Sequence, residues 1–227
     1  MLQIEGIHAS YGAGLVLHGV SLDVKEDEVV CILGRNGVGK STTLKAIMGL
    51  VATSSGTVQF RGEDITRKRT DRIAKRGIGY VPEDRDIFVN LTVLDNLKMA
   101  EIASRNPSRE RALQYFPKLK DLLDQEGGSL SGGEQQMLAI ARAVTGGADL
   151  MLLDEPSEGL APVIREELME VISELRKEVA ILLVEQNLQM TLDLADRIYI
   201  MVSGAIAFTG TPEEMQESKA VEKYLML

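Results

Sequence analysis

Residues 34–41 have the spacing with the clearest chemistry in this sequence. They run Gly-Arg-Asn-Gly-Val-Gly-Lys-Ser and fit the pattern G-x-x-x-x-G-K-[ST]. Glycines in such a loop let backbone N–H groups point at phosphate oxygens, and the start of the following helix adds partial positive charge. The pattern predicts a cradle for nucleotide phosphates, with Lys40 at the β- and γ-phosphates and Ser41 on Mg²⁺. The residues expected to form it are Gly34, Arg35, Asn36, Gly37, Val38, Gly39, Lys40, Ser41 and Thr42.

A second element is the carboxylate pair Asp154 and Glu155, which follows an apolar run at residues 150–153. A strand that ends in two acids places them at the edge where open α/β sheets bind ligands. We expect Asp154 to hold Mg²⁺ through water and Glu155 to polarise the attacking water of a hydrolysis. Taken alone, the pair would more simply be a solvated turn. Beside a phosphate loop, the chemical interpretation is favoured.

The third element is the segment 130–134, Leu-Ser-Gly-Gly-Glu, at the start of an expected helix. Ser131 is suited to cap that helix, and a plain capped turn is the alternative interpretation. The exposed N–H groups of a helix start also form an anion site. One chain with two phosphate-binding helix starts suggests that two chains share each nucleotide.

These residues must be positioned by strands and helices that alternate along the chain. We expect strands at residues 2–8, 19–24, 28–33, 56–61, 78–81, 150–153, 179–184 and 198–202. We expect helices at residues 40–50, within 91–124, and at 133–144, 163–177, 188–195 and 212–227. The alternation predicts a mostly parallel sheet with helices on both faces, interrupted by a helical insertion near residues 84–147.

Composition limits the class of protein. Hydrophobic residues at 44% and charged residues at 26% are ordinary for a soluble globular protein. No apolar run reaches the length of about 18 residues that a membrane-spanning helix needs. A net charge of −9 argues against a general nucleic-acid binder, and a single cysteine, Cys31, suits a reducing cytoplasm. A local basic run at residues 67–76 is interpreted as a solvated face, with contact to lipid or a partner as the alternative.

In that order, GRNGVGKS, LSGGE and LMLLDEP resemble the motif set of the ABC ATPases, and the likeness extends over the entire chain. The resemblance implies one ABC ATPase domain over residues 1–227, with an α/β, RecA-like P-loop NTPase core and an N-terminal antiparallel β-subdomain. Core and β-subdomain would take residues 1–83 and 148–227. An inserted α-helical subdomain would take residues 84–147.

The resemblance also implies roles for residues that the spacing alone does not explain. Ser131 and Gly133 match the positions that close on the γ-phosphate held by the other subunit. Tyr11 lies where the family stacks an aromatic ring on adenine, although simple packing on the β-subdomain would also explain it. Residues 157–160 fall where the family's dimer-contacting loop lies.

Two positions depart from the general family pattern. Glu83 follows Val-Pro where the family usually has glutamine, and Gln186 stands where it usually has the histidine of the switch. Both departures resemble the ATPases of branched-chain amino-acid importers and of close relatives that import amides or urea. We therefore expect Gln186 to act in catalysis, and Glu83 either to bind Mg²⁺ or to contact the membrane partner. The two histidines, His8 and His18, are expected to be structural or surface residues.

The resemblance implies an importer's ATP-hydrolysing subunit, using ATP and Mg²⁺ on the cytoplasmic face of the cell membrane. Its partners would be a second ATPase subunit (identical or paralogous), membrane-spanning permease subunits and, indirectly, a solute-binding protein, with no nucleic acid. The solute is expected to be branched-chain amino acids, with urea or short amides as the alternative. A soluble ABC ATPase of DNA repair or translation, and a nucleotide-binding regulator without turnover, are further alternatives.

Overall fold

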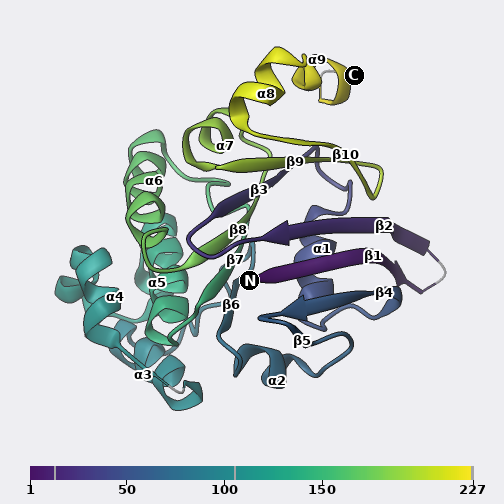
Figure 1. Cartoon of the computed structure of the whole chain (residues 1–227). Coiled ribbons are helices and arrows are strands. Elements are labelled where there is room, and N and C mark those ends of the chain that lie inside the picture. Colours follow the sequence, from purple (N-terminus) through teal and green to yellow (C-terminus); the bar gives the residue numbers. More distant parts are fainter. Residues whose placement is uncertain (13, 105, 226–227) are drawn as a thin grey trace.

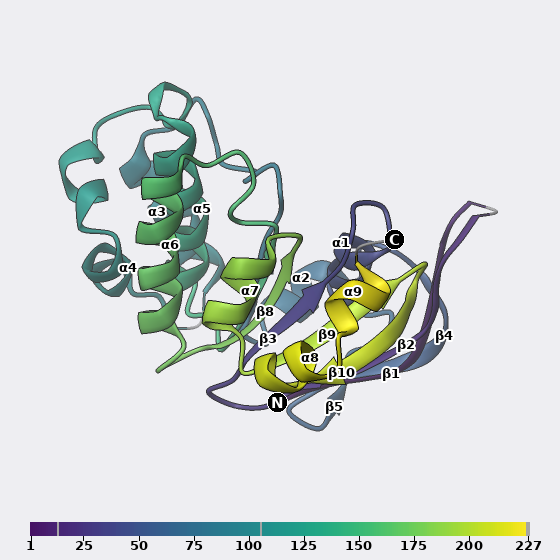
Figure 2. The same cartoon turned by 90° about the horizontal axis from the view of Figure 1, so that it is seen from above.

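The computed structural model describes residues 1–12, 14–104 and 106–225 (Figure 1). Two β-sheets lie on one side of the molecule and a group of helices lies on the other, as the view from above shows (Figure 2). No helix in the described part of the chain is both long enough and apolar enough to cross a membrane.

The first sheet is antiparallel and has the order β2-β1-β4-β5. Its strands are β1 (Leu2–Tyr11), β2 (Gly14–Val24), β4 (Thr53–Phe60) and β5 (Glu63–Asp64). Burial alternates along much of β1, as expected when one face of a strand packs on the core and the other meets solvent. This sheet is the antiparallel β-subdomain that the sequence predicts.

The second sheet carries the parallel strands and has the order β10-β9-β3-β8-β7-β6. Its strands are β3 (Val29–Leu33), β6 (Ile78–Val81), β7 (Leu150–Asp154), β8 (Ala180–Glu185), β9 (Arg197–Val202) and β10 (Ala205–Gly210). All neighbours are parallel except β10, which pairs antiparallel with β9. Strand β8 lies between β3 and β7, so the carboxyl ends of these three strands lie side by side.

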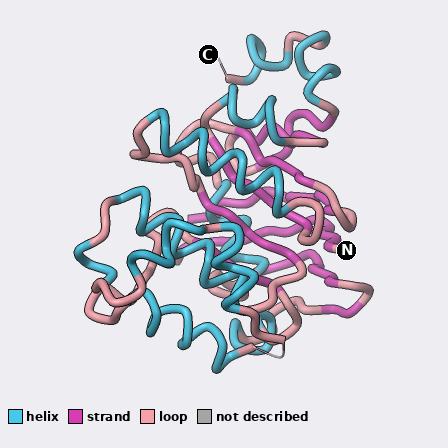
Figure 3. Tube along the Cα trace, turned by 90° about the vertical axis from the view of Figure 1, so that its left-hand side faces the viewer, coloured by secondary structure: helices cyan, strands magenta, loops and turns pink. Residues whose placement is uncertain are grey.

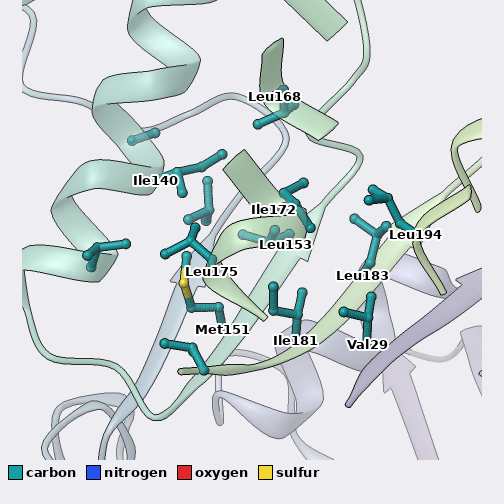
Figure 4. Packing of buried hydrophobic residues seen from close by; sticks show 14 of the residues in the cluster. Val29, Ile140, Met151, Leu153, Leu168, Ile172, Leu175, Ile181, Leu183 and Leu194 are labelled. Carbon is teal, nitrogen blue, oxygen red and sulfur yellow. The ribbon is translucent and has the colours of Figure 1, made fainter. Parts of the chain in front are cut away.

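Each face of the parallel sheet packs into its own hydrophobic core. In β3, Cys31 faces one core, whereas Val30 and Ile32 face the other. The first core lies against α6 (Pro162–Leu175), α7 (Leu188–Leu194) and α5 (Gly132–Thr145). Figure 4 shows Leu153 and Leu183 of the sheet in this core with Leu168, Ile172 and Leu175 of α6. The second core lies between the two sheets and contains α1 (Lys40–Ile47).

In Figure 3 helices lie in front of part of the strands; a helical group lies beside the sheets. It contains α3 (Val93–Ala103), α4 (Arg109–Tyr115), the 3₁₀ turns Pro117–Leu122 and Gly127–Ser129, and α5. Three of these helices begin with a capping hydroxyl, from Thr92, Ser108 and Ser131. The domain limits given above stay a prediction.

Several elements differ from those the sequence predicts. Strands β5 and β10 and the short helix α2 (Thr70–Ala74) were not expected, and β2 begins earlier than residue 19. The expected closing helix is divided into α8 (Pro212–Glu217) and α9 (Ala220–Tyr224), because Lys219 adopts a left-handed backbone conformation with φ 54°. Its last two residues, 226 and 227, lie outside the described residues.

Candidate functional site

Lys40 is the first residue of α1, directly after the glycine-rich loop that follows β3. Gly39 has φ 110°, a conformation that side-chain-bearing residues rarely adopt. The loop closes on the lysine, whose Nζ donates to the carbonyl oxygens of Gly34 (2.9 Å) and Arg35 (3.1 Å). Nζ also lies 2.9 Å from Oε1 of Glu155, and both side chains are buried. The structure therefore brings the predicted phosphate-binding lysine and the predicted catalytic acid into one ion pair.

Ser41 and Asp154 meet although 113 residues separate them: the Ser41 hydroxyl donates to Oδ1 of Asp154 at 2.8 Å. Tyr80 in β6 donates its hydroxyl to Oδ2 of the same carboxylate at 3.1 Å. Burial raises the pKa of Asp154, and these two hydrogen bonds act against that rise. The hydroxyl and carboxylate oxygens fit Mg²⁺, which takes oxygen ligands and is usually held by one or two carboxylates together with substrate phosphates. No group of three or more His, Cys, Asp or Glu residues in the described ranges could hold a metal alone.

Glu155 has a backbone conformation that is rare outside glycine, with φ 46°. Its N–H donates to the carbonyl of Val184 in the neighbouring strand at 2.9 Å, which fixes the turn. Left-handed residues outside glycine cost of order 1–3 kcal/mol and cluster at functional sites. The conformation turns the acid out of line with β7, and its carboxylate reaches Lys40.

Glu185 ends β8 and is one of two site residues that the sequence reasoning missed. The residue is 2% exposed, and its carboxylate accepts hydrogen bonds from the backbone N–H groups of Ser157, Gln186 and Asn187. Burial raises the pKa of Glu185. The signal was an acid at the end of an otherwise apolar strand; for the other missed residue, Tyr80, no sequence signal existed. Gln186 follows with an exposed side chain at the same sheet edge.

A cavity of about 340 Å³ lies over this edge. Its lining includes Glu83, Glu155 and Val16 of β2. From the glycine-rich loop and α1 it includes Asn36, Gly37, Gly39, Lys40, Ser41 and Thr42. Tyr11 lies at the end of β1, on the same hairpin as Val16, and its side chain is 53% exposed. The cavity thus collects most of the predicted cradle around the buried ion pair.

The segment 130–134 starts α5 on another part of the molecule. The Ser131 hydroxyl accepts from the Glu134 N–H (3.4 Å), and the Glu134 carboxylate accepts from the Ser131 N–H (2.8 Å), which makes a capping box. Gly133 lies against α6, where a Cβ on it would come within 2.6 Å of Cγ2 of Ile164. The capped turn is therefore present, and the anion site at the same helix start stays a prediction.

A second carboxylate lies close to Glu155. Glu158 belongs to the turn after β7, and its N–H donates to the carbonyl of Glu155 at 3.1 Å. A side-chain hydrogen bond with Glu155, together with burial, raises the pKa of Glu158 to about 7. The Glu158 carboxyl is therefore harder to ionise than a free glutamate, because the Glu155 carboxylate lies beside it.

A larger groove of about 940 Å³ lies next to the cavity, between the sheets and the helical group. Its walls come from α1, α2, β6, α3 and α5, and include exposed Leu50 together with Asp84 and Asp86. Glu83 lines both the groove and the cavity. The basic run beside it is largely paired, since Lys68 and Arg76 bind Glu63.

The chain matches a family model and several known proteins. The family model described as "ABC transporter" matches residues 17–158. The high-affinity branched-chain amino acid transport ATP-binding protein BraG of Pseudomonas aeruginosa is 41% identical, with 93% of each chain covered. The probable branched-chain amino acid transport ATP-binding protein LivF of Archaeoglobus fulgidus is 40% identical over 100% of this chain and 98% of its own. The lipopolysaccharide export system ATP-binding protein LptB of Haemophilus influenzae is 36% identical over 98% and 95%.

Solved structures give the same result for the fold. A nucleotide-free ATP-binding cassette from an ABC transporter superposes with a TM-score of 0.87 and 29% identity, covering 100% of this chain and 96% of that one. A dimeric cassette in a post-hydrolysis state, bound to ADP and Pi, has a TM-score of 0.81 and 25% identity over 93% and 99%.

Proposed function

The chain belongs to the ABC transporter family of ATP-binding proteins, and from that premise we propose that it hydrolyses ATP as one half of a dimer and drives branched-chain amino-acid transport. The observation that carries the proposal is the cluster of Lys40, Ser41, Asp154 and Glu155, in which Lys40, Ser41 and Glu155 line the cavity and Asp154 binds Ser41 from the side of the larger groove. Lysine, hydroxyl and two carboxylates at one sheet edge are the groups that phosphoryl transfer to water requires.

Each residue of the cluster has a separate task in this proposal. The loop amides and Lys40 hold the β- and γ-phosphates. Ser41 and Asp154 would hold Mg²⁺, which when bound neutralises charge on the phosphates. Glu155 orients the attacking water and accepts its proton, since its carboxylate already points at the phosphate-binding lysine. Gln186 holds the γ-phosphate or the water from the adjoining strand end, because an amide both donates and accepts hydrogen bonds.

The second half of the nucleotide site would come from another copy or a paralogue. The first N–H groups of α5, those of Gly132 and Gly133, lie at an exposed helix start that Ser131 caps, where anions bind favourably. A relative of known structure is a dimer with ADP and Pi bound, which supports this arrangement.

The membrane partner would occupy the groove of about 940 Å³. Apolar Leu50 in its wall and the exposed side chains of Ile102 and Met99 on α3 suit a permease helix. On this proposal the chain lies on the cytoplasmic face of the membrane. The printed names of BraG and LivF support branched-chain amino acids as the solute, above the lipopolysaccharide of the less similar LptB.

The test of the proposed chemistry is Glu155→Gln. The variant should bind ATP and lose turnover by about two orders of magnitude or more, as when a general base is removed. It should also accumulate an ATP-bound dimer, which light scattering would detect. Turnover close to that of the wild type would remove Glu155 from the mechanism. Purification of the chain from its native membranes with its permease, followed by uptake assays with leucine, tests the solute.

Glu83 has two candidate roles because it lines both the nucleotide cavity and the large groove. If its carboxylate binds Mg²⁺, Glu83→Gln should raise the Mg²⁺ concentration for half-maximal ATPase activity, since the hard ion prefers carboxylate oxygen. Identical Mg²⁺ curves for the isolated chains, with a loss only of permease-stimulated activity, would assign Glu83 to the partner instead.

A further inference from the structure

The loop between β6 and α3 holds two consecutive residues in the left-handed region. Arg85 has φ 68° and Asp86 has φ 46°, and neither is glycine. Such a conformation costs free energy and persists only where surrounding contacts impose it. The contacts that hold Arg85 and Asp86 in this conformation therefore indicate the role of the loop.

Those contacts lead to the helix that carries the second anion site. The Arg85 guanidinium donates from Nε to Oε1 of Gln136 (3.3 Å) and from Nη1 to Oε1 of Gln135 (3.2 Å), both in α5. Further along α5, Arg142 donates to the carbonyl of Asp86 at 2.6 Å. The loop therefore contacts α5 at two points, and one of them lies in the first turns of the helix.

The guanidinium of Arg85 lies against the first residue of α5, Gly132. A Cβ on Gly132 would lie 3.3 Å from Nη1 of Arg85, so this glycine lets the guanidinium lie against the segment 130–134. Gln136 is 3% exposed, and its side-chain oxygen accepts from Arg85, whereas its Nε2 has no hydrogen-bond partner among the described residues. Gln135 in turn donates to the carbonyl of Gly127, in the turn that leads into the segment.

The acidic neighbours of Arg85 border the large groove. Glu83, Asp84 and Asp86 line the large groove, and Glu83 also lines the nucleotide cavity. One short loop therefore borders the groove with its carboxylates and grips α5 with the guanidinium between them.

We propose that Arg85 is a positioning residue: its two-pronged contact with Gln135 and Gln136 sets the orientation of residues 131–134, and so their affinity for the phosphates on a second chain. This inference rests on the proposed function, because it takes the segment to act on the nucleotide of the other subunit. Arg85 links the loop beside the groove to residues 131–134 through its hydrogen bonds to Gln135 and Gln136.

The first measurement is hydrogen exchange in the monomer without nucleotide, which requires no second chain. Arg85→Ala should speed exchange of the hydrogen-bonded amides of Ser131 and residues 134–136 by about tenfold, as expected for losing hydrogen bonds to a charged group. Arg85→Lys keeps the charge but cannot engage both glutamines, so it should restore only part of the protection. The matched control is Arg69→Ala. Arg69 is an exposed arginine of the basic run at residues 67–76, directly before α2, and its removal should leave the exchange rates of these amides unchanged. Unchanged exchange in Arg85→Ala would overturn the inference.

The second measurement is ATP-dependent dimerisation in the Glu155→Gln background with Mg²⁺-ATP. Arg85→Ala should raise the dimer dissociation constant about tenfold while the monomer binds a fluorescent ATP analogue as before, because residues 131–134 act only across the dimer. Gln135→Ala should weaken dimerisation too, and adding it to Arg85→Ala should weaken it little further.

The two results separate the inference from the proposed function. If the background protein forms no ATP-dependent dimer, the shared-nucleotide function fails, and with it the role of Arg85 across the dimer. If the background dimerises and Arg85→Ala dimerises equally well, only the inference fails. A loss that appears equally in monomer nucleotide binding would also overturn it.

Discussion

Replacing Gly133 by alanine separates the steric role of this glycine from any contact with a nucleotide. Its missing Cβ would point into the chain's own structure, 2.6 Å from Cγ2, 3.3 Å from Cγ1 and 3.5 Å from Cβ of Ile164 on α6. Isoleucine is stiff at χ1 because it is branched at Cβ, so Cγ2 cannot swing aside as the end of a long side chain would. Either α5 or α6 must shift.

The expected magnitude is the difference of two opposing effects. Overpacking of this kind costs typically about 1–3 kcal/mol. Alanine at a helical position gains up to about 1 kcal/mol over glycine in helix propensity. We expect Gly133→Ala to lower the free energy of unfolding by about 1–2 kcal/mol, which for a chain of this size is a fall of about 2–8 °C in melting temperature.

Two substitutions at position 164 test whether the clash is the cause. Ile164→Ala removes Cγ2 and should relieve the clash, so the double variant should be more stable than the sum of the single effects by about 1–3 kcal/mol. Ile164→Val keeps a methyl at Cγ2 and should give almost no relief. Thermal unfolding of all variants without nucleotide provides the comparison.

The same variants report on the nucleotide site. Because the new methyl points inward, Gly133→Ala with Ile164→Ala should also recover ATP-dependent dimerisation in the Glu155→Gln background. Equal relief from alanine and valine at position 164, or none from either, would refute the steric reasoning. Restored stability without restored dimerisation would show that the methyl meets the second chain.

Three further predictions concern the nucleotide site. If the exposed ring of Tyr11 stacks on adenine, Tyr11→Ala should weaken ATP binding by about 1–2 kcal/mol and Tyr11→Phe should be nearly silent in calorimetry; unchanged affinity in the alanine variant would favour a packing role. Gln186→Ala should lower kcat more than it weakens ATP binding, and a normal rate would place the switch elsewhere. In the folded chain the pKa of Glu158 is raised from 4.5 to about 7, so ionising this carboxyl increasingly disfavours the fold as the pH rises through that window. The melting temperature of the wild type minus that of Glu158→Gln should therefore fall between about pH 5 and about pH 8, and a constant difference would show that folding does not raise the pKa of Glu158.

Much of the fold was predictable because its signals are local. The loop before Lys40 and the acid pair at Asp154 are contiguous runs, each following an apolar strand, and parallel strands bring their carboxyl ends to one edge. The α/β class, the mostly parallel sheet and the antiparallel N-terminal sheet are confirmed. Strand β10 was missed because only its antiparallel pairing with β9 distinguishes it from a loop.

The parts of the site that could not be predicted depend on contacts between distant segments. Tyr80 lies 74 residues from Asp154, and Arg85 lies 50 and 51 residues from the glutamines that it binds. Glu185 was visible as an acid, but its bond to the Ser157 N–H exists only because β7 and β8 are neighbours. Side-chain contacts between segments so far apart follow from packing, and no single stretch of sequence encodes them.

The buried ion pair between Lys40 and Glu155 makes the proposed catalytic carboxylate an internal competitor of ATP. A phosphate group that approaches Lys40 must displace the oxygen that lies 2.9 Å from Nζ, in a site where both side chains are buried. A neutral glutamine at position 155 competes far less, since the strength of this contact comes from charge. Affinities measured with Glu155→Gln, the variant that traps bound nucleotide, should therefore exceed those of the wild-type chain. At protein concentrations too low for dimerisation, the ratio of the two affinities measures how strongly the carboxylate holds the lysine before nucleotide binds.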